Sequence, residues 1–292
     1  MNCWQHEGAS LQGEGKMSSN CRLCTKFLFA IFVLGVMLFY SELNIPAISG
    51  SRATRNQFYF VQITDTHFGD EDNYERTRQV IQAINNLPLK IEFVVHTGDI
   101  TMEMLEHTPT VNSVVELFKL LKPPVHYISG NHDIIRQKHD ATMQVYRRHF
   151  GELITQYEYS GVVCIFIYTE PLAKDFYVPS YDALEELDKR LKLSAGKPVI
   201  VFHHSPSVED FFNNQMHPGW RAEIRDRWIA LLNKYDVKGV IAGHFHRDEL
   251  HWLGNVPLYV SASVAGYWGR QATFRIYEYK DGKIGYRTQY LF

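Results

Sequence analysis

Side chains that could bind metal ions or transfer protons follow five short apolar runs of this sequence. One such run ends at Gly130-Asn131-His132-Asp133, which offers an amide oxygen, an imidazole and a carboxylate in succession. Each residue alone would usually be an ordinary polar residue, but five such positions in order favour a shared site. The candidates are Asp65, His67, Asp99, Asn131, His132, His203 or His204, His244 and His246.

This set of side chains predicts a pair of divalent metal ions. Carboxylates and imidazoles crowded together at neutral pH need a compensating cation. Imidazole nitrogens with carboxylate and amide oxygens suit Mn, Fe or Zn better than Ca. Two ions about 3.5–4 Å apart need a shared ligand. Asp99 is the best candidate for that ligand because it follows Gly98 on the strand that lies between the other two in sequence.

Hydrolysis is the chemistry expected of such a centre. The metals would bring the pKa of a bridging water towards neutrality, and the resulting hydroxide would attack phosphorus in line. His132 would donate a proton to the leaving oxygen or stabilise the phosphoryl oxygens. Asp65 and His67 are two residues apart, so on an extended turn both could reach one ion. His244 and His246 have the same spacing, with the side chain between them pointing away.

An alternation of strands and helices is expected to position these groups. In the first half, strands 58–64, 91–95 and 125–128 are separated by helices 74–87 and 111–121. This order is typical of an α/β fold, in which ligands bind at the carboxyl ends of the strands.

The second half is predicted to form another sheet that finishes as a meander. The expected elements are helix 142–150, a hairpin over 157–168, helix 181–193, strand 199–202, helix 221–235 and strand 237–242. Four strand-like runs follow, with no helix expected between them: 247–253, 256–262, 272–279 and 284–291.

The N-terminal stretch carries an apolar segment of a different kind. Residues 27–40 are uninterrupted by polar side chains, which suits a signal peptide better than a full bilayer span. Arg22 and Lys26 precede it and favour export of the rest of the chain. We expect a cytosolic tail at 1–26, a cleaved signal or retained anchor at 27–48, a linker at 49–57 and a folded domain at 58–292. Met17 is an alternative start.

Composition narrows the possible functions. Apolar residues make up 45% and aromatic residues 14% of the 292 residues, enough for a sizeable core. The net charge of −2, without a basic block, argues against electrostatic binding of nucleic acid. Cys164 is expected in the core, and no disulfide framework is indicated. Cys21-x-x-Cys24 gives weak support for zinc or redox chemistry, and acylation beside a membrane is an equal alternative.

The motif order resembles that of the calcineurin-like metallophosphoesterase superfamily. It reads Asp65-x-His67, Gly98-Asp99, Gly130-Asn131-His132-Asp133, His204-x-Pro206 and Gly243-His244-x-His246. The resemblance covers residues 58–292 and implies a four-layer α/β/β/α sandwich of two mixed sheets with flanking helices, and a hydrolase of phosphate esters.

The same resemblance implies a division of the ligands between the two metals. One metal would be held by Asp65, His67, Asp99 and His246. The other would be held by Asp99, Asn131, His204 and His244, with His132 over the phosphate. The His-x-Pro spacing favours His204 over His203.

One departure from the family pattern concerns the catalytic histidine. Many members read Gly-Asp-x-x-Asp, whereas this chain has Met102 at the last position. The departure argues against the protein phosphatases that continue Arg-Gly, and leaves open what positions His132, since Asp133 could instead hold the turn. The Gly-His-x-His ending looks more like the phosphodiesterase, purple-acid-phosphatase-like and bacterial exported branches.

The substrate is left open by these motifs. Loop 207–220 and segment 265–270 are expected at the pocket rim. Tyr267 and Trp268 could stack on a base or sugar and Arg270 could bind a second phosphate, with ordinary turn packing as the alternative. Besides a general phosphate-ester hydrolase, we consider a phosphodiesterase acting on cyclic nucleotides or glycerophosphodiesters, and a catalytically weak metal-binding module. The sequence does not indicate an oligomeric state.

Overall fold

A computed structural model describes residues 56–70, 73–179, 181–209 and 219–291. The predicted tail, the apolar segment 27–48 and nearly all of the linker lie outside the described residues, as does most of the predicted loop at 207–220. Within the described ranges, no helix is long and apolar enough to cross a membrane.

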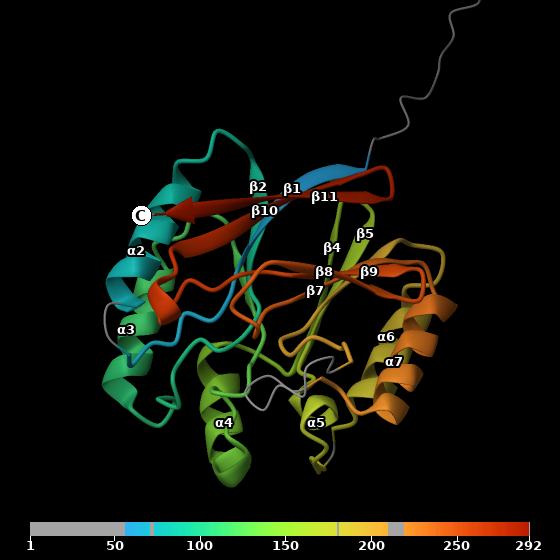
Figure 1. The fold of residues 1–292 in the computed structure, drawn as a ribbon, viewed down its shortest axis with the longest axis horizontal. Coiled ribbons are helices and arrows are strands. Elements are labelled where there is room, and N and C mark those ends of the chain that lie inside the picture. The colour runs from blue at the N-terminus through green and yellow to red at the C-terminus, as the bar shows by residue number, and fades with distance from the viewer. Residues whose placement is uncertain (1–55, 71–72, 180, 210–218, 292) are drawn as a thin grey trace, which may run out of the picture. The chain divides into compact units, whose positions relative to one another are not determined.

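Two mixed sheets form the centre of the fold (Figure 1). In the first, β1, β2 and β3 are parallel and β10 and β11 continue the sheet antiparallel beyond β1. In the second, β5, β6, β7 and β9 are parallel, with β4 and β8 antiparallel at the edges. The first sheet has the order β11 (Lys283–Leu291), β10 (Ala272–Lys280), β1 (Gln57–Ile63), β2 (Ile91–His96), β3 (Val125–Tyr127). The second has the order β4 (Ile154–Tyr159), β5 (Val162–Ile167), β6 (Val199–Phe202), β7 (Val237–Ala242), β9 (Val256–Val260), β8 (Glu249–Leu253).

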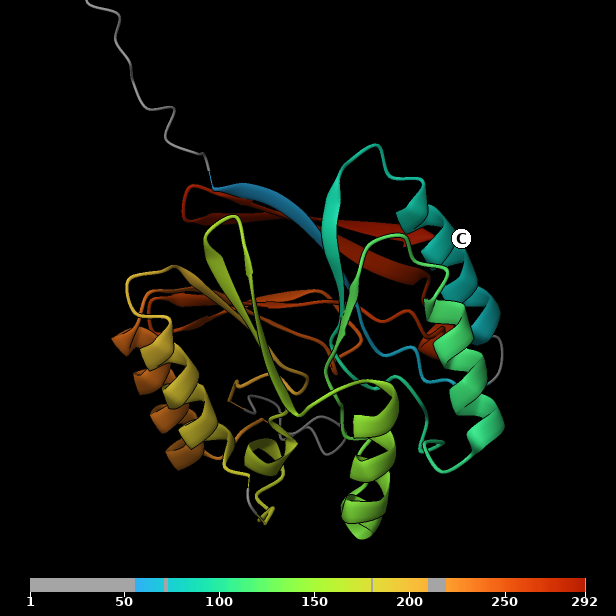
Figure 2. The same cartoon turned by 180° about the vertical axis from the view of Figure 1, so that it is seen from behind.

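Helices cover the outer face of each sheet, and Figure 2 shows the same layers from behind. α2 (Asn73–Asn85), α3 (Thr108–Phe118) and α4 (His139–His149) pack against the first sheet through one apolar cluster. α6 (Ala183–Leu193) and α7 (Ala222–Lys234) pack against the second sheet through another. The predicted four-layer α/β/β/α sandwich is therefore confirmed.

Aromatic rings fill the space between the two sheets. Phe60 of β1 stacks on Phe93 of β2 at 5.0 Å and on Tyr277 of β10 at 4.8 Å between ring centroids. Successive strand residues point to opposite faces. In β1, Phe60 therefore faces the second sheet while Val61 faces the helices.

The C-terminal part of the chain differs from the prediction in two ways. β10 and β11 were expected to extend the second sheet, but they join the first, where Phe60 of β1 lies opposite Tyr277. The paired aromatic rings explain this choice, because both belong to the layer between the sheets. A 3₁₀ turn, Tyr267–Gly269, also interrupts the tail where no helix was expected. The short helices at Arg136–Lys138 and Glu170–Ala173 (α5) were not predicted either.

An ion pair between the buried Arg275 and the partly exposed Asp248 links the two sheets just beyond the last motif. The guanidinium of Arg275 in β10 is fully buried and donates to the Asp248 carboxylate, which also accepts from the backbone N–H of Ala262 at 2.9 Å. Burial raises the pKa of Asp248, but Arg275 and the hydrogen bonds outweigh it and hold that pKa below its ordinary value. The carboxylate is therefore charged at neutral pH and its contribution is lost only on acidification.

Asp248→Asn should lower the free energy of unfolding by about 2–4 kcal/mol, because it leaves the Arg275 charge buried without its counter-ion. Urea denaturation at pH 7 measures the change. Glu158→Gln is a matched control, since Glu158 and Lys197 form an exposed pair and the expected change there is under about 1 kcal/mol. Equal urea midpoints for both variants would show that the pair of Arg275 and Asp248 contributes no more than an exposed pair.

Candidate metal centre

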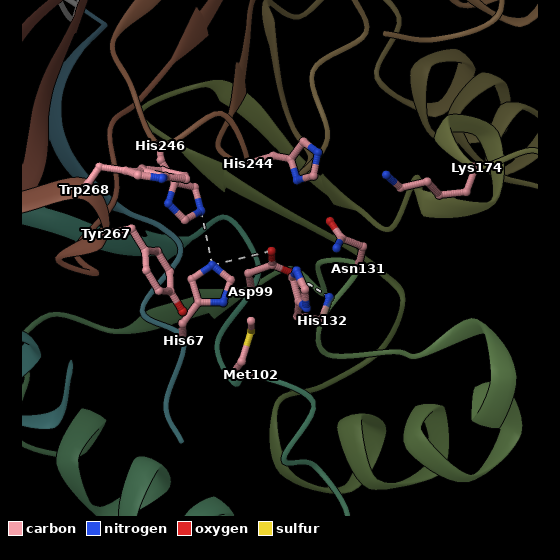
Figure 3. A pocket seen from close by; sticks show the side chains of 10 residues that line it. All are labelled: His67, Asp99, Met102, Asn131, His132, Lys174, His244, His246, Tyr267 and Trp268. Atoms are coloured by element: carbon pink, nitrogen blue, oxygen red, sulfur yellow. Dashed lines mark hydrogen bonds and ion pairs between the residues drawn. The ribbon is translucent and has the colours of Figure 1, made fainter. Parts of the chain in front are cut away.

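The predicted site residues come from the carboxyl ends of five parallel strands in the two sheets. The loops after β1, β2 and β3 of the first sheet meet the loops after β6 and β7 of the second at one edge of the sandwich. They surround a pocket of about 600 Å³, drawn in Figure 3. Its lining includes His67, Asp99, Asn131, His132, His244 and His246. The topology thus brings His67 and His246, which are 179 positions apart in the chain, into contact.

A first group consists of Asp65, His67 and His246, all buried. The Nε2 atoms of the two imidazoles face each other at 3.2 Å. Asp65 Oδ1 lies 3.8 Å from the Nε2 of His67 and 3.3 Å from that of His246. Ligand atoms this close together, on three side chains from two loops, have the arrangement of one metal site.

A second group consists of Asp99, His204 and His244, also buried. His204 Nε2 lies 3.1 Å from Asp99 Oδ2, and His204 Nδ1 lies 2.8 Å from the carbonyl oxygen of Thr97. A carbonyl only accepts, so Nδ1 carries the hydrogen and Nε2 of the neutral ring has its lone pair towards Asp99. Such backbone hydrogen bonds fix the tautomer of metal-binding histidines.

Asp99 of the second group also lies close to the first group. Its Oδ2 is 3.1 Å from His204 of the second group and 3.8 Å from His67 of the first, while its Oδ1 accepts from the backbone N–H of His132 at 2.8 Å. This is the position required of a carboxylate shared by two metal ions.

The electrostatics of the centre call for a cation. Burial works to raise the pKa of Asp65 and Asp99, but the histidines around them outweigh it and hold both pKa values below their ordinary range. Burial works to lower the pKa of His204, yet the Asp99 carboxylate raises it to about 10. Without a metal, a proton on His204 would therefore supply the missing positive charge.

The residues present fit two divalent ions. Asp65 Oδ1 and Asn131 Oδ1 are buried and accept no hydrogen bond from any described residue. Buried carboxylate and amide oxygens seldom remain unsatisfied unless an ion or water takes the place of the donor. The other Asp65 oxygen accepts from the Thr64 hydroxyl at 2.6 Å and from the His244 N–H at 3.0 Å, which fixes the direction of Oδ1.

The ligand loops are turns with left-handed backbone, not the extended turns expected from the spacing. The φ values are 52° at Asp65, 45° at His67, 54° at Asp99, 69° at His244 and 55° at His246. These turns send His244 and His246 to different groups while Asp65 and His67 remain in one. Phe245 does point away, as expected, and packs in the core of the second sheet.

Two glycines let the loops approach one another. Gly98 has a φ of +104°, and a Cβ there would lie 2.5 Å from His204 Nδ1. A Cβ on Gly243 would overlap the Thr64 hydroxyl. Both positions require glycine because the facing loop leaves no room for a side chain.

His132 lies beside the first group, next to the pocket. Its ring meets the His67 ring edge-on at 5.2 Å between centroids, and its side chain is 30% exposed. Asp133 does not orient it, because the Asp133 carboxylate instead accepts from the N–H groups of Gly130, Ile100 and Thr101. Among the described residues, Glu103 is the carboxylate that pairs with the His132 ring, with Oε1 3.7 Å from Nδ1.

Glu103 was missed because it occupies the position after Met102, one later than the family motif places its second carboxylate. A left-handed φ of 55° turns the chain at Glu103, and its N–H donates to the His132 carbonyl at 3.0 Å. Met102 stands where the family motif has a carboxylate, and this departure was the available signal that another carboxylate lies nearby.

His96 is a second residue that we missed. Its Nδ1 accepts from the N–H of Gly98 at 3.2 Å, so its Nε2 donates to the Thr66 hydroxyl at 2.9 Å. Burial lowers the pKa of His96 to about 3, so the ring is neutral at physiological pH and joins the first two ligand loops. Its place at the end of β2 carried the same signal as the other strand-end histidines.

His204 and His203 are clearly separated by the structure. His203 Nδ1 lies 3.3 Å from the Thr169 hydroxyl, and its ring packs beside Trp220 and Trp228 in the core. His204, and not His203, faces the centre.

The predicted rim residues behave differently from one another. Tyr267 stacks on His246 at 5.4 Å, and Trp268 lies beside the same ring at 5.5 Å, so both line the pocket. Arg270 does not line it. Its guanidinium donates to the His246 carbonyl and lies over the Trp268 ring, beside a neighbouring hollow. The structure therefore places Arg270 behind the rim, where it supports His246.

A four-layer sandwich with two adjoining Asp and His groups at its strand ends defines a dinuclear metal-dependent phosphoesterase. Residues 58–248 match the family model of the calcineurin-like phosphoesterases, and the chain belongs to that family.

Two curated relatives illustrate its range. Serine/threonine-protein phosphatase CPPED1 of Danio rerio is 26% identical over 240 residues, which cover 71% of this chain and 76% of the relative. The probable glycerophosphodiester phosphodiesterase GpdQ of Arcobacter nitrofigilis is 30% identical over 232 residues, which cover 70% of this chain and 77% of the relative.

Solved structures share the fold at low sequence identity. A dimetal phosphatase from Danio rerio matches with a TM-score of 0.56 and 13% identity, over 80% of this chain and 98% of that one. GAP50, the anchor in the inner membrane complex of Plasmodium, matches with a TM-score of 0.60 and 14% identity, over 80% and 84%. The same fold occurs in a protein named as an anchor, so the fold alone does not imply catalysis.

Proposed function

We propose that this protein hydrolyses phosphate esters in the pocket at the metal centre. In this proposal, His132 donates a proton to the leaving oxygen or stabilises the phosphoryl oxygens. The seven proposed metal ligands are Asp65, His67, Asp99, Asn131, His204, His244 and His246. The observation that carries the proposal is the position of Asp99 Oδ2, within 4 Å of a histidine from each group. Two divalent ions bound there would lower the pKa of a water nucleophile towards neutrality and offset the charge of the phosphoryl group.

The chain's own side chains orient and protonate the substrate. The backbone N–H of His132 donates to Asp99, which holds the backbone at His132 in place relative to the ligands. Part of the ring is exposed to the pocket, where it can donate a proton to the leaving oxygen or hydrogen-bond to a phosphoryl oxygen. Mn, Fe or Zn are the metals that suit these ligands.

Metal analysis of the purified protein, with p-nitrophenyl phosphate and bis-p-nitrophenyl phosphate assayed side by side in Mn²⁺, tests the proposal. We expect close to two metal ions per chain and turnover of at least one ester. Bound metals without turnover would favour the alternative of a metal-binding module. Absence of bound metal would overturn the proposal.

A phosphodiesterase is the second candidate. It is favoured by the 30% identity to a relative named as a probable glycerophosphodiester phosphodiesterase. Cleavage of the diester, or of a glycerophosphodiester or cyclic nucleotide, in preference to the monoester would support it.

Export is a further part of the proposal, based on the apolar segment after Arg22 and Lys26. The folded domain would then lie in a periplasmic, extracellular or lumenal space, with the segment cleaved or kept as a single tether. Protease protection of a C-terminally tagged full chain tests this, and a cytosolic domain would contradict it.

Glu103→Gln is expected to lower kcat by about 3- to 10-fold without loss of metal. The Glu103 carboxylate and the His132 ring are partly exposed and 3.7 Å apart, so their attraction is modest. Glu106→Gln is the matched control, because Glu106 pairs with Lys138 at the surface and should leave kcat unchanged. A Glu103→Gln enzyme with wild-type kcat would show that another group positions His132.

A further inference from the structure

Lys174 is held at the pocket by a short, well-anchored helix. It follows α5, and its backbone N–H donates to the Glu170 carbonyl at 2.9 Å. Glu170 is buried, and its carboxylate accepts from the N–H of Ser205 at 3.2 Å. Ser205 comes directly after the ligand His204, so the backbone of α5 is fixed relative to the metal centre.

The Lys174 side chain extends from α5 into the pocket. Figure 3 shows its nitrogen directed towards Asn131 and His244, on the side opposite Tyr267 and Trp268. Of the described residues that line the pocket, it is the only Lys or Arg. No described carboxylate forms an ion pair or hydrogen bond with its ammonium group, so its charge is available to a ligand.

The charge of the centre gives this lysine a definite role. Two divalent ions held beside the carboxylates of Asp65 and Asp99 would leave two positive charges, and a hydroxide nucleophile would offset one of them. The remaining charge matches a phosphodiester, which carries one negative charge. A phosphomonoester carries close to two at neutral pH, because its second pKa is about 6. Lys174 supplies the second positive charge.

We infer that Lys174 makes this site select phosphomonoesters over phosphodiesters, with the leaving group directed to the aromatic side formed by Tyr267 and Trp268. The inference rests on the proposed function and assigns the charge of its substrate. The ammonium group is on the side of Asn131 and His244, so it can bind a charged phosphoryl oxygen of a monoester there. In a diester, that oxygen would instead carry the second ester group and no charge.

The test compares wild-type protein with Lys174→Met, which keeps the apolar length of the side chain, and Lys174→Arg, which keeps the charge. kcat/KM is measured for p-nitrophenyl phosphate and bis-p-nitrophenyl phosphate at pH 7.5, about 1.5 pH units above that second pKa. The wild type should prefer the monoester. Lys174→Met should lower kcat/KM by about 10- to 100-fold for the monoester, as expected for the loss of one charged hydrogen bond. For the diester, kcat/KM should fall by less than about 3-fold. Lys174→Arg should restore most of the monoester activity.

Binding without turnover gives an independent readout. Titration calorimetry on metal-loaded protein measures the affinity for each ligand. Lys174→Met should weaken the binding of inorganic phosphate by about tenfold and leave the binding of dimethyl phosphate unchanged. Lys283→Met, at an exposed position on β11, is the control and should match wild type throughout. Metal content should be equal in all variants.

The outcomes separate this inference from the proposed function. Equal losses on both esters, an unchanged Lys174→Met enzyme, or a wild type that prefers the diester would overturn the role of Lys174 while leaving a phosphoesterase. A wild type that binds two metals and cleaves neither ester would instead count against the proposed function. The affinities for inorganic phosphate and dimethyl phosphate would then still decide whether Lys174 binds the second negative charge of a phosphate group.

Discussion

Replacing Asp99 with alanine is expected to abolish both metal binding and turnover. Asp99 Oδ2 faces His204 at 3.1 Å and His67 at 3.8 Å, so its loss removes a ligand from each group at once. Without the carboxylate charge between them, two bound cations would also repel each other more strongly. Elemental analysis and assay of the same preparation measure both effects, with about a 10⁴-fold or greater loss of kcat expected for a residue on which the whole centre depends.

The backbone at Asp99 calls for a second variant. Its φ of 54° is unfavourable for alanine, so Asp99→Ala could lose activity by unfolding. Asp99→Asn tolerates this conformation and keeps the shape of the side chain, but it lacks the negative charge. We expect a folded Asp99→Asn protein, judged by circular dichroism, with fewer than two metals and little turnover. Two metals retained in that variant would refute the bridging role.

His132→Ala should retain both metals and lose about 10²–10⁴-fold in kcat. His132 belongs to neither ligand group, yet its ring reaches the pocket beside His67. His149→Ala, on the last turn of α4 away from the pocket, is the control. A wild-type kcat for His132→Ala would show that this ring is not the proton donor.

The leaving group distinguishes the two roles considered for His132. If His132 protonates the leaving oxygen, the loss of kcat should be much larger for phenyl phosphate, whose phenolate is a poor leaving group, than for p-nitrophenyl phosphate. If it stabilises the phosphoryl oxygens, the losses should be similar. Both substrates carry the same phosphoryl charge, so Lys174 does not affect the comparison.

Much of the fold and site could be predicted because the relevant signals are local. Apolar runs that end in Asp, His or Asn mark the carboxyl ends of the strands, and parallel strands bring those ends to one edge. The pairing of β10 with β1 could not be predicted in this way. Its alternating pattern fits either sheet, and the choice depends on aromatic contacts between Phe60 and Tyr277 that lie 217 positions apart in numbering.

The details of the site depended on conformations that spacing does not reveal. Asp65 and His67 could be assigned to one group from their separation, but the same separation at His244 and His246 leads to two groups because of left-handed turns. Lys174 carried no signal at all. It follows a four-residue helix, and only the fold distinguishes it from the lysines on the surface.

The left-handed turns also mean that the metal centre lowers the stability of the fold, which has a consequence for evolution. Five proposed ligands adopt a conformation that costs a non-glycine residue roughly 1–2 kcal/mol, with aspartate and histidine tolerating it better than most. Glycine at these positions would relieve the backbone strain and remove the ligand together. A lineage selected for stability alone would therefore drift towards losing this centre, and random variants screened only for heat resistance should be enriched in inactive proteins with substitutions at these five positions.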